Sequence, residues 1–307
     1  MSDFAIQARQ LCRNFGELTA IDNLNLEVEK GQIYGLLGPN GCGKTTAMRM
    51  LTGLLLPSSG TVSVLGLNLP GDAEKLRLKM GYMTQKFSLY NDLTIKENLQ
   101  FIAKIYGLSH QEQRTRIDQL LATYDLASKT TQLAGNMSGG QKQRLGLAAA
   151  TIHKPELLFL DEPTSAVDPE NRRDFWEKLF DLSDQGTSIM VSTHYMDEAE
   201  RCHKLAILEA GVKRADGSPD TLMHDMGAHV VEVNAHDLRQ LKQQLTTLPE
   251  IISAAQLGSR LRVLVNDSCV DPIGFLAQLE SLSPQQLHLV RPSLEDVFVT
   301  CTGRSVP

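Results

Sequence analysis

The amino-acid sequence predicts an α/β fold with a small α+β portion towards its C-terminal end. A short apolar run at 32–37 leads through a glycine-rich loop into an apolar-periodic segment that a glycine ends at 53, which is a strand–loop–helix pattern. The stretch at about 86–153 is mainly helical, whereas the tail from 228 onward has strand-like and helix-like segments in the order β-α-β-β-α-β. That order is typical of a ferredoxin-like fold.

The composition is that of an ordinary soluble globular protein. Its 307 residues are 42% hydrophobic and 21% charged, and a net charge of −6 predicts no basic groove for nucleic acid. No run reaches the roughly 18 apolar residues of a membrane span, and the N-terminus does not read as a signal peptide. The five cysteines form no CxxC pair, which predicts reduced cytosolic thiols. Any membrane association is therefore expected to go through a partner.

The glycine-rich loop has the chemistry of a phosphate-binding P-loop. It consists of Gly38, Pro39, Asn40, Gly41, Cys42, Gly43, Lys44, Thr45 and Thr46. A Gly-x4-Gly-Lys-Thr loop between a strand and a helix lets several backbone N–H groups converge on one anion at the helix N-terminus. Lys44 can then reach the β- and γ-phosphates, and the Thr45 hydroxyl can ligate Mg²⁺. We therefore predict a P-loop NTPase core of the RecA-like kind.

Cys42 is the unusual residue of this loop. It stands among backbone N–H groups at a helix N-terminus, an environment that lowers the pKa of an accessible cysteine. The alternative is that the thiol replaces a small alanine and points into packed side chains. Because the loop must stay open for phosphate to enter, we expect a reactive thiol that bound nucleotide protects.

Short segments around the P-loop predict an antiparallel β portion. Apolar and polar residues alternate at 4–10, 21–28 and 61–64, which predicts antiparallel strands beside the P-loop strand, and a turn is expected at 66–71. Phe15 is placed on a loop before the P-loop strand, where its ring can stack on an adenine. A lone phenylalanine is more often a core residue, so only its position favours stacking.

A second glycine-rich loop follows the helical stretch. Before this stretch, Gln85 ends a short apolar strand, and its carboxamide oxygen can reach Mg²⁺ or a water, although a lone glutamine is usually a solvated surface residue. The second loop precedes a helix and so predicts a second anion site. It contains Ser138, Gly139, Gly140 and Gln141.

Two carboxylates and a histidine stand at the ends of later strands. Asp161 and Glu162 follow the apolar run 157–160; in a P-loop enzyme the aspartate holds Mg²⁺ and the glutamate can orient or deprotonate water. Solvated acids at a strand end are the commoner alternative, but the two glycine-rich loops upstream favour the catalytic interpretation. His194 ends the strand at 187–194, and its imidazole can donate to a γ-phosphate oxygen, although a lone histidine is usually structural.

Together these motifs resemble the nucleotide-binding subunit of an ATP-binding cassette (ABC) transporter over about residues 4–225. The matching motifs are the adenine-stacking aromatic (Phe15), Walker A (38–46), Q-loop (Gln85), signature (137–141), Walker B (157–162), D-loop (165–168) and H-loop (His194). Departures occur at Cys42, where alanine or serine is usual, at Met137, where leucine is usual, and at 166–167, where Gly-Leu is common. None of them removes a catalytic group.

Three further segments, 92–99, 192–199 and 292–298, resemble the ABC-2-type exporter ATPases, a group that includes multidrug and antibiotic exporters. The resemblance implies ATP and Mg²⁺ as cofactors and a homodimer or heterodimer of ATPase subunits that encloses two ATP molecules. It also implies a separate permease with about six membrane spans per subunit. The chain would then lie on the cytoplasmic face of the inner (plasma) membrane, with no nucleic-acid partner.

The resemblance also assigns roles to the site residues. Lys44 and Mg²⁺ would offset phosphate charge, Glu162 would polarise water, and His194 would fix the γ-phosphate. Gln85 would lie near the groove through which closing and opening of the two ATPase chains drive the permease. Asp161, Thr45 and Gln85 would form the metal site. The signature loop, Ser138 to Gln141, would close on the partner chain's ATP.

The expected domains are a nucleotide-binding domain at 1–226, with a helical subdomain at about 86–153, and an α+β accessory domain at 227–307. The accessory domain shows no catalytic cluster, which indicates a packing or regulatory module. One alternative function is a soluble ABC ATPase acting on ribosomes or DNA, although such proteins usually carry two cassettes, a coiled-coil insert or basic patches. A P-loop kinase or GTPase is the other, against which the signature at 137–141 argues.

Overall fold

The computed structural model describes residues 3–165, 167–278 and 282–303. The chain forms two compact units, one ending at Lys213 and the other beginning at Arg214. This division precedes the boundary expected after residue 226. Helix α8 (Pro219–His224) contacts helix α11 (Leu294–Thr302) near the end of the chain, so the residues between the two boundaries are held by the second unit.

The centre of the first unit is formed by five strands of a six-stranded sheet, whose order is β10-β9-β3-β8-β7-β6; the sixth strand, β10, begins at the end of this unit. The strands are β3 (Ile33–Leu37), β6 (Met80–Met83), β7 (Leu157–Asp161), β8 (Ser188–Thr193), β9 (Lys204–Glu209) and β10 (Val212–Gly217). Strands β9, β3, β8, β7 and β6 run parallel, and β3, β7 and β8 are buried along their whole length. Parallel strands buried on both faces read as continuous apolar runs, and their carboxyl ends meet at one edge.

The antiparallel strands form a separate four-stranded sheet, in the order β2-β1-β4-β5. Its strands are β1 (Phe4–Phe15), β2 (Leu18–Glu29), β4 (Ser59–Val64) and β5 (Leu67–Leu69). They do not pair with the P-loop strand, contrary to expectation, because β8 and β9 occupy both edges of β3. Two further expectations were wrong: the turn at 66–71 contains β5, and Phe15 is the last residue of β1 instead of a loop residue.

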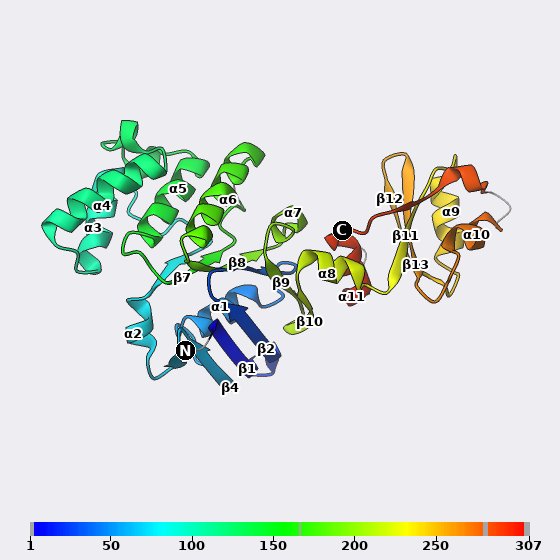
Figure 1. The fold of residues 1–307 in the computed structure, drawn as a ribbon, viewed down its shortest axis with the longest axis horizontal. Helices are drawn as coiled ribbons and strands as arrows, with labels where there is room; N and C mark the ends of the chain where they lie inside the picture. Colours follow the sequence, from blue (N-terminus) through cyan, green and yellow to red (C-terminus); the bar gives the residue numbers. More distant parts are fainter. Residues whose placement is uncertain (1–2, 166, 279–281, 304–307) are drawn as a thin grey trace. The chain divides into compact units, whose positions relative to one another are not determined.

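Helix α1 (Lys44–Leu51) joins the two sheets through a hydrophobic cluster (Figure 1). Its Ala47 and Met48 are fully buried and belong to the same cluster as Ile6 of β1 and Leu36 of β3. Helix α2 (Ala73–Arg77) then leads from β5 to β6. The packing of α1 therefore fixes the P-loop between two sheets.

Four longer helices pack together on the other side of the six-stranded sheet (Figure 1). They are α3 (Ile95–Ile105), α4 (His110–Thr123), α5 (Gly139–Ala150) and α6 (Pro169–Asp184), with η1 (Ala127–Lys129) and η2 (Ala134–Asn136) between α4 and α5. Capping boxes begin α3, α4 and α5, which fixes where each helix starts. A short helix α7 (Met196–Ala199) follows β8.

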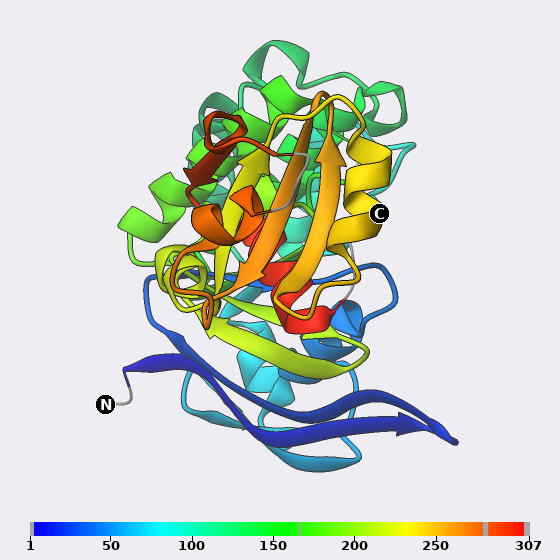
Figure 2. The ribbon, with the colours of Figure 1, turned by 90° about the vertical axis from the view of Figure 1, so that its right-hand side faces the viewer.

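The second unit contains a four-stranded antiparallel sheet in the order β12-β13-β11-β14 (Figure 2). In chain order its elements are β11 (Ala228–Val233), α9 (Leu238–Leu245), β12 (Ile251–Leu257), β13 (Arg260–Asn266), α10 (Pro272–Ala277), η3 (Pro284–Gln286) and β14 (Leu287–Val290). Helix α9 buries Leu238, Leu241 and Leu245 in one cluster with the strands, and Leu276 of α10 joins them.

Helix α11 is tied to this sheet by an ion pair between the buried Asp296 and the partly buried Arg262. Arg262 of β13 donates from Nε and Nη2 to the two carboxylate oxygens of Asp296, at 2.9 and 2.7 Å. Burial alone would raise the pKa of Asp296, but the hydrogen bonds from Arg262 and Ser293 outweigh it and hold that pKa below its ordinary value. The pair therefore stabilises α11 while both groups are charged.

Among the described residues, no helix combines the length and apolar character that crossing a membrane requires.

Candidate functional site

The P-loop places Lys44 at the start of α1 with its ammonium group buried. Gly43 before it has φ of +107°, and a Cβ there would lie 2.6 Å from the carbonyl oxygen of Ala20, so this position requires glycine. The Nζ of Lys44 donates to the carbonyl oxygens of Gly38 at 2.8 Å and Pro39 at 3.2 Å. The loop thus curls around the lysine that it is expected to aim at phosphate.

Glu162 lies at the centre of the site. Its Oε1 is 3.1 Å from Nζ of Lys44, and its Oε2 accepts a hydrogen bond from Nε2 of Gln85 at 3.0 Å. Nδ1 of His194 is 3.3 Å from the same Oε2, at an angle that makes no hydrogen bond. The four residues predicted to be catalytic, which come from four separate segments, therefore meet around one buried carboxylate.

The backbone of Glu162 is itself constrained. Its φ of +45° is uncommon for a residue other than glycine, and such strain is often found at functional sites. Its N–H group donates to the carbonyl oxygen of Ser192 at 3.1 Å and to its hydroxyl at 3.0 Å. The adjacent strand β8 therefore holds Glu162 in this conformation.

Asp161 and Thr45 meet beside Glu162. The Thr45 hydroxyl donates to Oδ1 of Asp161 at 3.2 Å, and the Ser192 hydroxyl donates to the same oxygen at 2.6 Å. Hydroxyl and carboxylate oxygens are the hard donors that Mg²⁺ prefers, so this pair fits the ion. Within the described residues no cluster of three His, Cys, Asp or Glu could hold a metal.

Ser192 was not predicted from the sequence. Its hydroxyl joins the Asp161–Thr45 pair to the backbone of Glu162, and the residue is fully buried. The available signal was a polar residue inside a buried strand, two positions before His194. A buried hydroxyl requires a hydrogen-bond partner, and here that partner is Asp161.

A cavity of about 630 Å³ opens beside this network. Besides P-loop residues, Gln85 and Glu162, its lining includes Phe15, Leu18, Thr19, Ala20, Ala210 and Gly211. Phe15 is 47% exposed, and the guanidinium of Arg13 lies over its ring at 4.4 Å from the centroid. An exposed aromatic face next to the P-loop suits an adenine ring. The residues of β2 and the turn at 210–211 carried no sequence signal for this role.

Cys42 does not face this cavity, and the expectation of a reactive thiol was wrong. The side chain is buried in the cluster that contains α1, and its Sγ lies so close to Gly38 that a Cβ there would be 2.6 Å away. Burial raises the pKa of the thiol above its ordinary value, and the charge of Lys44 only partly opposes this. The cysteine therefore acts as a small packing residue.

The signature loop lies apart from the P-loop cavity. Ser138 caps α5: its hydroxyl accepts from the Gln141 N–H at 3.4 Å, and its own N–H donates to Oε1 of Gln141 at 3.1 Å. The described residues that line the P-loop cavity include none of Ser138, Gly139, Gly140 and Gln141. Ala166 of the expected D-loop is outside the described residues.

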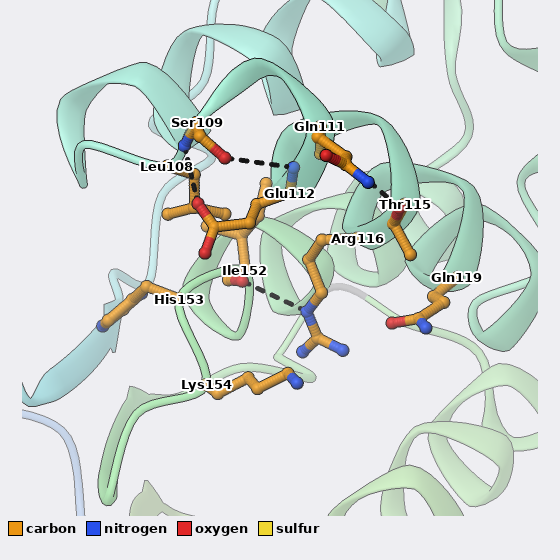
Figure 3. A pocket seen from close by; sticks show the side chains of 10 residues that line it. All are labelled: Leu108, Ser109, Gln111, Glu112, Thr115, Arg116, Gln119, Ile152, His153 and Lys154. Carbon is orange, nitrogen blue, oxygen red and sulfur yellow. Dashed lines mark hydrogen bonds between the residues drawn. The ribbon is translucent and has the colours of Figure 1, made fainter.

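Another cavity, of about 730 Å³, lies between α4 and the residues that follow α5 (Figure 3). Arg116 points into it and donates from Nε to the carbonyl oxygen of Ile152 at 3.1 Å and from Nη2 to that of Thr151 at 2.7 Å. Burial lowers the pKa of this guanidinium below its ordinary value. Arg116 thus binds the carbonyl groups at the end of α5, where a helix dipole favours a cation.

The relatives found by comparison with known proteins are named as ATP-binding proteins. A family model described as ABC transporter matches residues 21–165. The probable multidrug ABC transporter ATP-binding protein YbhF of Escherichia coli (strain K12) is 44% identical over 217 residues, or 71% of this chain. Those residues are only 38% of that protein, so the chain spans well under half the length of this relative. Nod factor export ATP-binding protein I of Cupriavidus metallidurans is 39% identical over 304 residues, 98% of both chains.

Solved structures share the fold of most of the chain. One described as the structure of an ATP binding subunit of an ABC transporter is 29% identical, with a TM-score of 0.67, over 73% of this chain and 93% of that one. Another is a dimeric ATP-binding cassette in a post-hydrolysis state, bound to ADP and Pi. It is 25% identical, with a TM-score of 0.64, over 69% of this chain and 98% of that one.

Proposed function

The chain belongs to the ABC transporter family as an ATP-binding subunit, and from that premise we propose that it hydrolyses ATP to drive an ABC-2-type membrane exporter. The observation that carries this proposal is the meeting of Lys44, Gln85 and His194 around Glu162, beside the Asp161–Thr45 pair. Such a set offers a phosphate-binding cation, a metal site and a general base within one polar network.

Each residue of the site has its own role in ATP hydrolysis. The P-loop N–H groups and Lys44 bind the phosphates, and Phe15 stacks on the base. Glu162 orients the attacking water and accepts its proton, while His194 donates to the γ-phosphate. Gln85 holds the carboxylate of Glu162 and so links this step to the segment that follows β6. Thr45, Asp161 and Gln85 would hold Mg²⁺, which would supply positive charge that offsets the charge of the phosphates.

Two chains, identical or different, would enclose two ATP molecules. The position of the signature loop away from the P-loop cavity supports this arrangement, because the loop can then bind the γ-phosphate held by a partner. A related cassette is described as dimeric with ADP and Pi bound, which also supports it. The helix N-terminus at Ser138, with its Gly-Gly sequence, offers N–H groups for that contact.

The remaining parts of the proposal concern the transporter. We place the chain on the cytoplasmic face of the inner membrane, bound to a separate permease with about six spans per subunit. One relative is named for multidrug transport and the other for Nod factor export, which favours the exporter over a soluble ATPase acting on ribosomes or DNA. The permease would select the cargo.

For the C-terminal unit we propose a ferredoxin-like accessory domain with a packing or regulatory role. The chain order β11-α9-β12-β13-α10-β14, with the sheet order β12-β13-β11-β14, supports this proposal. We retain residue 226 as the functional end of the nucleotide-binding part, because the expected phosphate-handling motifs all precede it.

Copurification tests the exporter proposal. A tagged chain is purified in mild detergent from membranes of cells that also make its candidate permease, and ATPase activity is measured in liposomes with and without the permease. We expect the two proteins to copurify and the permease to raise ATP hydrolysis. A chain that instead stays soluble and sediments with ribosomes or DNA would contradict the proposal.

A further inference from the structure

One side chain, Asn171, joins the helix that follows the D-loop to the helix that begins at the signature loop. Its Nδ2 donates to Oδ2 of Asp168 at 2.7 Å, and its Oδ1 accepts from Nη2 of Arg144 at 2.9 Å. Asp168 is the N-cap of α6 and Arg144 belongs to α5, which packs against α6 (Figure 1). The amide therefore links the start of α6 to the middle of α5.

The chemistry of the neighbours fixes the orientation of this amide. The carboxylate of Asp168 can only accept, and the guanidinium of Arg144 can only donate. A flipped amide would place an oxygen against the carboxylate and an NH₂ group against the guanidinium. Asn171 thus holds one orientation, and rotation of either helix relative to the other breaks a hydrogen bond.

Asn171 also contacts the signature loop directly. A Cβ built on Gly140 would lie 2.8 Å from Cγ of Asn171, so the Asn171 side chain lies directly against this glycine. At its other end, α5 is held by the hydrogen bonds of Arg116 to Thr151 and Ile152. Loss of the Asn171 contacts would therefore free the signature end of α5 while its far end stays fixed.

We propose that Asn171 is a positioning residue that fixes the signature loop relative to the D-loop, so that the loop is aligned for the ATP bound by the partner chain. This inference rests on the proposed two-chain site. Its consequence is specific: a change at Asn171 impairs the site completed by its own signature loop and leaves its own P-loop intact.

Hydrogen–deuterium exchange of the single chain tests the contact itself. Asn171→Asp removes the donor to Asp168 and places two carboxylates together, so exchange of the amides at 138–142 should rise about tenfold. The double variant D168N/N171D restores a donor–acceptor pair and should return exchange to within about twofold of wild type. Arg173→Ala, an exposed change on the same helix, is the control. Unchanged exchange in Asn171→Asp, or no rescue in the double variant, would overturn the proposal.

Mixed dimers test the direction of the effect. Asn171→Ala should keep nucleotide affinity and lower ATP hydrolysis about tenfold. Mixed with Lys44→Ala chains, it should regain activity, because one site then pairs an intact P-loop with an intact signature loop. Mixed with Ser138→Arg chains, it should regain none. The proposal would be overturned if Ser138→Arg chains restored activity and Lys44→Ala chains did not. Wild-type activity of Asn171→Ala by itself would also overturn it.

A control mixture separates the two levels of inference. Lys44→Ala and Ser138→Arg chains, combined without any change at Asn171, should regain activity if two chains share each site. If this control fails, the two-chain site is wrong and the partner-directed role of Asn171 is overturned with it. A different outcome is a control that succeeds while the mixtures that contain Asn171→Ala depart from the expected pattern of activity with Lys44→Ala chains and none with Ser138→Arg chains. In that case the proposed function stands and this inference alone is overturned.

Discussion

The two glycine-rich loops differ in what surrounds them within the chain. Through Lys44, the P-loop is joined to Glu162 and to a polar network that reaches four segments, and a cavity opens beside it. The signature loop has its own helix cap and the contacts of Asn171, but it does not line that cavity. The comparison teaches that one loop lies within a polar network of its own chain, whereas the other is left, as we propose, to bind the ATP of a partner chain.

Replacing Glu162 should have the largest effect on ATP hydrolysis. Glu162→Gln keeps the size of the side chain and an acceptor for Gln85 but removes the base, so hydrolysis should fall by at least about 100-fold. ATP should still bind and, unhydrolysed, hold two chains together. Phosphate release and light scattering with MgATP would measure both effects. Hydrolysis at the wild-type rate would show that the base lies elsewhere.

Removing the Ser192 hydroxyl should have a smaller effect on the same site. Ser192→Ala loses the hydrogen bond to Asp161 and one acceptor for the Glu162 N–H, so hydrolysis should fall about tenfold with a greater need for Mg²⁺. A Mg²⁺ titration of the rate provides the measurement. Ser88→Ala, outside this network, is the control. If the rate depended on Mg²⁺ as in the wild type, the hydrogen bond from Ser192 to Asp161 would have no role in Mg²⁺ binding.

A substitution in the second unit should lower the unfolding free energy without changing the affinity for ATP. Arg262→Ala leaves the buried Asp296 without its main hydrogen-bond donor, which should cost roughly 2–3 kcal/mol of unfolding free energy. ATP affinity should change less than about twofold, since no P-loop contact is lost. Urea unfolding and nucleotide titration give the two values. A large loss of ATP affinity in a folded variant would show that the second unit helps to form the site.

The same ion pair predicts a pH dependence. Because the folded pKa of Asp296 lies below the ordinary value of 3.8, its contribution is fully present above that value and is lost as pH falls through the folded pKa. Asp296→Asn should lack this component. Urea unfolding of both forms between about pH 6 and pH 3 would measure the difference. Parallel pH profiles of the two forms would contradict the assignment.

Cys42 should show the smallest effect. Because its thiol is buried and its pKa is raised, a maleimide should label Cys42 more slowly than the half-buried Cys12, with or without nucleotide. Cys42→Ala should keep ATPase activity within about twofold. Mass spectrometry of labelled peptides would measure the order of reaction. Rapid labelling of Cys42 that MgATP blocks would restore the reactive-thiol interpretation.

Sequence reasoning located the motifs because each joins a local pattern to a known chemistry. The P-loop with Lys44, the strand that ends at Asp161, and the helical stretch all depend on neighbouring residues, and those segments form the elements described above. Three-dimensional contacts were harder to anticipate. The burial of Cys42 depends on the direction of one side chain, which residue spacing does not determine.

The pairing of the strands escaped prediction for a similar reason. Alternating residues indicate a strand, but they do not say that β8 and β9 occupy both edges of β3 and leave β1 to a second sheet. Ser192 and Asn171 escaped because single polar residues gain their roles only from partners far away in the sequence. Asn171 acquires its role from Arg144, and Ser192 from Asp161.

Mixing two inactive variants tests most directly whether the signature loop serves the P-loop of a partner. Lys44→Ala and Ser138→Arg chains are each assayed alone and then together at equal concentration with MgATP. Each alone should be inactive, and the mixture should regain about one quarter of the wild-type rate, since half of the dimers are mixed and each has one intact site of two. A mixture that stays inactive, or a Ser138→Arg chain that is fully active alone, would contradict the account.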